Sequence, residues 1–169
     1  GGNLVRIDVE NARGENLTNG DLVGTKDGSA YGLVFDPQDE NVFYFSNNDK
    51  HCIYKYDLRT KECACWAGQE GKSGYLDGPI GQAMFNKPGQ MCVDSEGNII
   101  LTDTENHCIR KITMSTGYVS TLAGKPQNSG YVNGSAEDAQ FKKPLGICID
   151  NDDVMYIGDS ENRAIRRLA

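Results

Sequence analysis

The sequence predicts an all-β fold in which short strands are joined by tight turns. Its 169 residues include 20 glycines, and Asp, Asn and Gly gather between the apolar stretches, where they favour turns. Few stretches carry apolar residues at helical spacing. The strand-like stretches also recur at a fixed interval, so each copy is expected to adopt the same structure. We expect one domain, residues 1–169, because a chain of this length can bury its own core.

The charge balance argues against nucleic acid as a partner. The chain has 17 basic and 24 acidic residues, a net charge of −7, and the acidic residues are scattered through short turns. Such a field repels a phosphate backbone. No stretch approaches the ~18–20 apolar residues that cross a bilayer, and residues 1–10 lack the apolar core of a signal peptide. We therefore expect no membrane span and no nucleic-acid partner.

The strand candidates begin near the N-terminus, with "NLVRIDV" (3–9) and "GDLVG" (20–24). After them comes "AYGLVFD", which ends at Asp36, and similar segments end at Asp94 and Asp150. The period is clearest in "NNDKHCIYKY", "DTENHCIRKI" and "DSENRAIRRL". These three segments place His51, His107 and Arg163 at spacings of 56 and 56 residues.

Each copy holds four strand candidates. In the middle copy they cover about residues 90–93, 99–102, 108–112 and 119–123, joined by "DSEGN", "DTENH" and "MSTG", all rich in turn-forming residues. A four-stranded antiparallel unit at this interval is typical of a propeller blade, whose faces are buried by neighbouring blades. The first strand of each unit, the most apolar, is expected beside the central channel.

The repeats divide the chain into about three blades. We expect blades at residues 1–24 (outer strands only), 30–68, 89–124 and 145–169 (outer strand missing). Propellers usually close ~4–8 blades into a ring. We therefore expect either a segment of a longer propeller or a half-ring that a second copy completes as a homodimer.

Residues 74–124 carry the motifs "GYLDG", "AMFNKPGQMCVD", "GNIILTD", "NHCIRKI" and "GYVSTLAG". In these motifs the chain resembles the NHL repeat family. Residues 130–169 match again, whereas 21–68 match loosely and lack the A-x-F-x-x-P segment before Tyr31. The resemblance implies an NHL-type β-propeller, in that family usually six-bladed.

The neighbouring His107 and Cys108 could form a metal corner or a nucleophile with its base. Their repeat position favours a structural role, because Arg163 and Ala164 occupy the same two places in the next copy. With two histidines in the chain, a three-histidine zinc site cannot be completed from it. We expect no catalytic residues, no metal and no cofactor.

The six cysteines are expected to be buried free thiols, because Cys52 matches Cys108 and Cys92 matches Cys148 in repeat position. Disulfides remain an alternative. Cys63 and Cys65 could share a soft metal, because residues two apart in a strand point to one face.

Strands alternate in direction, so the second-to-third and the outer-to-inner connections emerge at the same end of the propeller. Exposed tyrosines there could stack on sugar rings or peptide groups, although Tyr75 and Tyr131 could instead hold their loops over the blades. We expect the ligand-binding residues to be Lys50, His51, Tyr75, Asp103, Glu105, His107, Tyr131, Asp159 and Arg163.

These observations predict a non-catalytic scaffold that binds a protein or a glycan. The resemblance extends to gut-type bacterial surface proteins, which implies export to the cell surface or periplasm and a link to polysaccharide uptake. Free thiols fit an intracellular location equally well. The alternatives are a metal-dependent lyase or hydrolase with its site in the channel, and a structural spacer between other domains.

Overall fold

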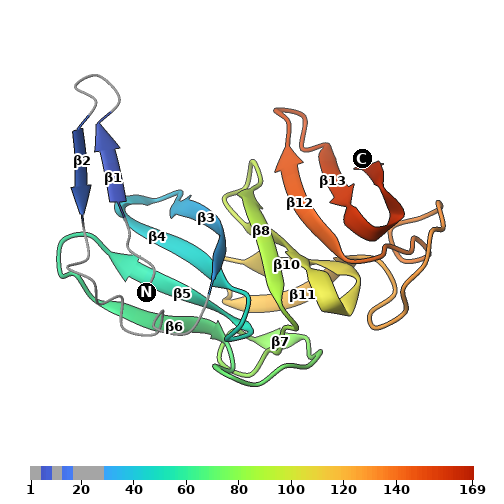
Figure 1. The fold of residues 1–169 in the computed structure, drawn as a ribbon, viewed down its shortest axis with the longest axis horizontal. Helices are drawn as coiled ribbons and strands as arrows, with labels where there is room; N and C mark the ends of the chain where they lie inside the picture. The colour runs from blue at the N-terminus through green and yellow to red at the C-terminus, as the bar shows by residue number, and fades with distance from the viewer. Residues whose placement is uncertain (1–4, 9–12, 17–28) are drawn as a thin grey trace.

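The computed structural model describes residues 5–8, 13–16 and 29–169, and these form antiparallel sheets that follow one another along the chain (Figure 1). A hairpin at the N-terminus pairs β1 (Val5–Asp8) with β2 (Arg13–Asn16). The first blade consists of β3 (Ala30–Asp36), β4 (Asp39–Asn47), β5 (Cys52–Asp57) and β6 (Cys63–Gly68).

The second blade has five strands, in the order β7, β11, β10, β9, β8. Their bounds are β7 (Gly78–Pro79), β8 (Pro88–Val93), β9 (Ile99–Asp103), β10 (Cys108–Thr113) and β11 (Tyr118–Ala123). The third blade has three, β12 (Pro144–Ile149), β13 (Met155–Asp159) and β14 (Ala164–Leu168). Short 3-10 helices, η1 (Thr104–Asn106) and η2 (Ser160–Asn162), follow β9 and β13. The inner strands β3, β8 and β12 lie next to one another.

The first seam, between the first and second blades, is an apolar core. Tyr44 and Ile53 of the first blade pack against Ala83, Phe85 and Met91, which lead into the second. Ile53 and Phe85 are fully buried. Because each fully buried large apolar side chain stabilises the fold by about 1.5–3 kcal/mol, the seam holds the two blades together.

The second seam, between the second and third blades, repeats this packing. Ile100 and Ile109 pack against Ala139, Phe141 and Ile147, which stand 56 residues after their first-seam counterparts. The A-x-F-x-x-P segment therefore has a physical role: it carries the small residue and the phenylalanine that cover the preceding blade.

The predicted all-β fold of four-stranded repeating units is confirmed, and the four strands predicted in the middle copy are β8 to β11. Two strands differ from expectation. The prediction left residues 13–16 and 78–79 as loops, yet they form β2 and β7, because each is held by pairing with a neighbouring strand. The strand predicted at 20–24 lies outside the described residues.

All six cysteines are free thiols, but only Cys52 and Cys108 are buried as expected; Cys63, Cys65 and Cys92 are partly buried, and the expectation that Cys148 is buried is wrong. Its side chain lies on the face of the third blade that no described residue covers. The same face exposes 76% of Ile165, whereas its repeat counterparts Ile53 and Ile109 are fully buried. The proposed ring, and whether a second copy or further blades complete it, stay predictions. No helix among the described residues is long and apolar enough to span a membrane.

Candidate functional site

The blades present two polar ends. We call one the loop face; it consists of the connections at residues 48–51, 69–77, 80–87, 104–107, 124–143 and 160–163. The other is the turn face; it consists of the hairpin turns at residues 37–38, 58–62, 94–98, 114–117 and 150–154. Because the strands are antiparallel, these connections alternate between the ends. The nine predicted ligand-binding residues belong to the loop face or to the strands that lead into it.

Asp103 is a structural anchor of the second blade. Its Oδ2 accepts a 2.6 Å hydrogen bond from Nη1 of Arg110, and both side chains are fully buried. Its Oδ1 accepts the backbone N–H of Asn86 at 2.8 Å. Burial raises the pKa of Asp103 to about 6, and the positive charge of Arg110 opposes that rise. Asp159 makes the equivalent 2.8 Å contact with Arg166 in the third blade.

Tyr75 and Tyr131 cover these arginines. Tyr75 places its ring 4.8 Å from the guanidinium of Arg110, and its hydroxyl lies 2.7 Å from the Thr121 hydroxyl. Tyr131 places its ring 4.8 Å from Arg166. Cation–π contacts of this kind hold each loop over its blade. Tyr131 exposes 61% of its surface, and the described third blade has no outer strand to supply the contact that Thr121 of β11 makes with Tyr75.

The two histidines link successive blades. Nδ1 of His107 accepts the backbone N–H of Lys143 at 3.1 Å, and Nδ1 of His51 accepts that of Lys87 at the same distance. His107 adopts a left-handed backbone with φ 59°, and its counterpart Arg163 has φ 52°. The structural role predicted for this position is confirmed.

Cys108 has no feature of an activated nucleophile. Its side chain is fully buried, and desolvation raises its pKa, whereas a reactive cysteine has a lowered one. The described residues hold no group of three His, Cys, Asp or Glu side chains that could bind a metal.

The remaining predicted residues are partly or fully exposed on the loop face: Lys50, Glu105 and Arg163. Lys143 bridges two acidic side chains there, with Nζ 3.3 Å from Glu105 and 3.1 Å from Glu161. The loop face is therefore a polar surface of mixed charge. Ligand binding at the nine residues stays a prediction.

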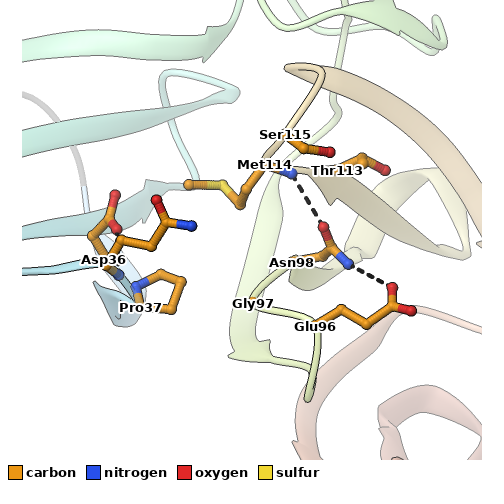
Figure 2. Close-up of a pocket in the computed structure, with 9 residues that line it drawn as sticks. Asp36, Pro37, Glu96, Gly97, Asn98, Thr113, Met114 and Ser115 are labelled. Atoms are coloured by element: carbon orange, nitrogen blue, oxygen red, sulfur yellow. Dashed lines mark hydrogen bonds between the residues drawn. The ribbon is translucent and has the colours of Figure 1, made fainter.

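Sequence reasoning missed a hollow on the turn face (Figure 2). It has a volume of about 390 Å³, within the ~300–1,000 Å³ usual for small-molecule sites. Three turns supply its walls, one from the first blade and two from the second. The lining residues are Asp36, Pro37, Gln38, Glu96, Gly97, Asn98, Thr113, Met114 and Ser115.

Hydrogen bonds hold several residues around the hollow in place, whereas other polar side chains of the lining form none with the residues that the structure describes. Asn98 accepts the Met114 backbone N–H at 3.2 Å and donates to Glu96 at 3.1 Å, as Figure 2 shows. Asp36 accepts from the Tyr44 hydroxyl at 2.7 Å. Within the described part of the chain, the side chain of Gln38 makes no hydrogen bond, and no cationic side chain lines the hollow.

The NHL repeat model matches residues 85–112, which run from Phe85 in the first seam to Ile112 in β10 and include the Asp103–Arg110 pair. The chain therefore carries a repeat of the NHL family. It is 30% identical over 149 residues to the NHL repeat-containing protein 2 of Gallus gallus, a match that covers 87% of this chain and 19% of the relative.

Two solved structures from Bacteroides thetaiotaomicron share the fold of this NHL-repeat chain, a β-propeller segment. A structural genomics protein of unknown function matches with a TM-score of 0.87 and 30% identity, over 98% of this chain and 41% of that one. An auxiliary nutrient binding protein matches with a TM-score of 0.81 and 29% identity, over 99% and 43%. The chain thus spans less than half the length of each of these proteins.

Proposed function

We propose that this NHL-repeat chain is a non-catalytic binding scaffold that recognises a glycan or a protein through the loops at the ends of its blades. The proposal is supported chiefly by the loop face, where three successive blades present exposed polar side chains and buried arginines anchor the loops of the second and third blades. Similarity along nearly the whole chain to an auxiliary nutrient binding protein favours a nutrient as the ligand. Of the two ligand classes, a glycan fits the mixed polar surface.

The frame explains why such a surface can bind without rearranging. Arg110 and Arg166 each hold two carbonyl oxygens of the loops above them, those of Leu76 and Met84 and those of Val132 and Gln140. A loop held in this way loses little conformational freedom when a ligand binds, which lowers the entropic cost of binding.

The proposed setting is export to the bacterial cell surface or periplasm, as part of a polysaccharide-uptake system. The relation to a Bacteroides nutrient binding protein favours this setting. Secretion of the full-length protein, followed by fractionation and immunodetection, tests it.

The experiment for the loop face compares two triple variants on an array of plant and host glycans. The loop-face variant is Lys50→Ala, Glu105→Gln and Arg163→Asn, in which asparagine tolerates the left-handed backbone of residue 163. The matched control is Glu62→Gln, Asn151→Ala and Asp152→Asn, on exposed turns of the opposite end that do not line the hollow.

We expect the loop-face variant to bind at least about tenfold more weakly, which corresponds to about 1.4 kcal/mol spread over three exposed polar contacts. The control should bind like the wild type. Equal affinity of the loop-face variant and the wild type for every bound glycan would rule out the loop face as the site.

A further inference from the structure

The hollow on the turn face exists because the first seam lacks a bridge that the second seam has. At the second seam, the Ser95 backbone N–H donates to Oδ1 of Asp153 at 2.9 Å, and the Ser95 hydroxyl donates to Oδ2. These bonds join the β8–β9 turn to the β12–β13 turn.

Proline and glycine occupy the two bridging positions at the first seam. Asp36 is the counterpart of Asp94, so Pro37 stands where the next blade has Ser95. Gly97 stands where the third blade has Asp153, and both have positive φ, 81° and 58°. Proline has no backbone N–H and no hydroxyl, and glycine has no side chain. The bridge cannot form, and the turns leave the hollow open.

The chemistry of the walls selects a neutral ligand that is rich in hydroxyl groups. Glu96 supplies a carboxylate acceptor, and Gln38, Thr113 and Ser115 supply an amide and two hydroxyls. Because no cationic side chain lines the hollow, an anionic ligand would be repelled by its two carboxylates. The Pro37 ring and Met114 add apolar surface, which suits the C–H face of a sugar ring.

A shallow groove extends the hollow along the first blade. It shares Asp36, Pro37 and Gln38 with the hollow and continues past Phe35, which exposes 53% of its surface. The Phe35 ring is supported from below by an edge contact with Phe43, with ring centroids 6.0 Å apart. Phe43 belongs to a cluster of first-blade residues on the side away from the second blade. Phe35 therefore stands where a preceding blade of a ring would pack, and the groove is left out of the proposed site.

We infer that the hollow at the first seam is a sugar-binding site, in which one neutral pyranose unit lies between Pro37 and Met114. The choice of a sugar rests on the function proposed above. The site itself is separate, because it lies at the opposite end of the blades from the loop face.

The test closes the hollow with the bridge that the chain already uses at its second seam. Pro37→Ser with Gly97→Asp installs the Ser95–Asp153 pair at the first seam. The double change also removes the proline ring, whose Cγ would lie 3.2 Å from a Cβ at position 97. Asp153→Asn is the matched control, because it alters the bridge of the second seam from the β12–β13 turn, which does not line the hollow, and asparagine tolerates the positive φ of residue 153.

Neutral cello-, xylo-, manno- and galacto-oligosaccharides of three or four units are titrated into the chain by calorimetry. We expect one of them to bind saturably, the closed variant to lose at least about tenfold in affinity, and Asp153→Asn to bind like the wild type. Gln38→Ala and Ser115→Ala keep the hollow open, and each should weaken binding about three- to tenfold through one lost hydrogen bond.

The inference is overturned if none of these sugars binds, or if calcium chloride alone binds there and sugars do not. It is also overturned if the closed variant, shown by its unfolding curve to be folded, binds as tightly as the wild type. In that last case, weaker binding by the loop-face variant would leave the proposed function standing with its site at the other end. If the closed variant instead fails to fold, the two open variants decide the outcome.

Discussion

Two isoleucines in the same repeat position provide the sharpest test of how the blades are held together. Ile109 is fully buried in the second seam, whereas Ile165 exposes 76% of its surface on the far face of the third blade. Ile109→Ala removes buried methyl groups and leaves a cavity beside Phe141, at a cost of about 2–5 kcal/mol. Ile165→Ala makes the same chemical change in the same strand position at an exposed site, where substitutions usually stay within about 0.5 kcal/mol.

Urea unfolding, monitored by tryptophan fluorescence, measures the loss in unfolding free energy for each variant. Thermal unfolding, monitored by circular dichroism, measures its melting temperature. Both are carried out at a concentration where light scattering shows a monomer. For a chain of this length, ~1 kcal/mol shifts the melting temperature by ~2–4 °C, so Ile109→Ala should melt at least about 4 °C lower. Ile165→Ala should melt within about 2 °C of the wild type. Equal losses from the two substitutions would refute the reasoning, because the seam would then not distinguish the two positions.

Three further predictions concern the same frame. Burial and the charge of Lys87 lower the pKa of His51 in the folded chain, so stability should fall as the pH drops below about 6.5, where the unfolded chain takes up the proton. His51→Asn should flatten this pH dependence in urea midpoints measured from pH 7.5 to 5.5. An unchanged slope in the variant would contradict this prediction. Gly124→Ala should destabilise more than Gly71→Ala, because both have positive φ but only at residue 124 would a Cβ meet another backbone, 2.9 Å from the His107 oxygen; thermal melts showing equal losses would count against this clash. Cys148 should react with a thiol reagent within seconds to minutes in the folded chain, whereas the buried Cys52 and Cys108 should react only on unfolding. Mass mapping of the labelled cysteines tests this order. Labelling of either buried thiol before Cys148 would be incompatible with the fold.

The repeat made most of the fold predictable. The strands of the middle copy lie within about two residues of their predicted bounds, because the turn-forming residues that separate them recur in each copy. The role of His107 could be predicted because Arg163 takes its place in the next copy. The strand bounds and the role of His107 could both be predicted without knowing which residues far apart in the sequence contact each other.

The features that escaped prediction depend on neighbours. The two residues of β7 have no strand pattern of their own and are held by pairing with β11. Cys148 was expected to be buried because it shares its repeat position with Cys92, in a strand. Cys92 packs at the second seam, but no described blade follows the third. Repeat position predicts a conformation, whereas burial also requires a neighbouring surface.

The hollow was missed for a related reason. Pro37 and Gly97 each look like ordinary turn residues in the sequence, and each is compatible with its own hairpin. Their effect appears only when the two turns face each other across a seam, where the counterparts Ser95 and Asp153 bond. Comparing both positions across the three copies is the signal that would have revealed it.

The measurement that tests the binding role most directly is hydrogen–deuterium exchange of the chain with and without a saturating neutral oligosaccharide. The account predicts that exchange slows in loops and turns at the ends of the blades, at residues 36–40, 96–98 and 113–116 for the hollow or at residues 104–107 and 130–143 for the loop face. It predicts unchanged exchange in the buried strands β9 and β10. If no oligosaccharide slows exchange at either end, the chain is not a glycan-binding scaffold.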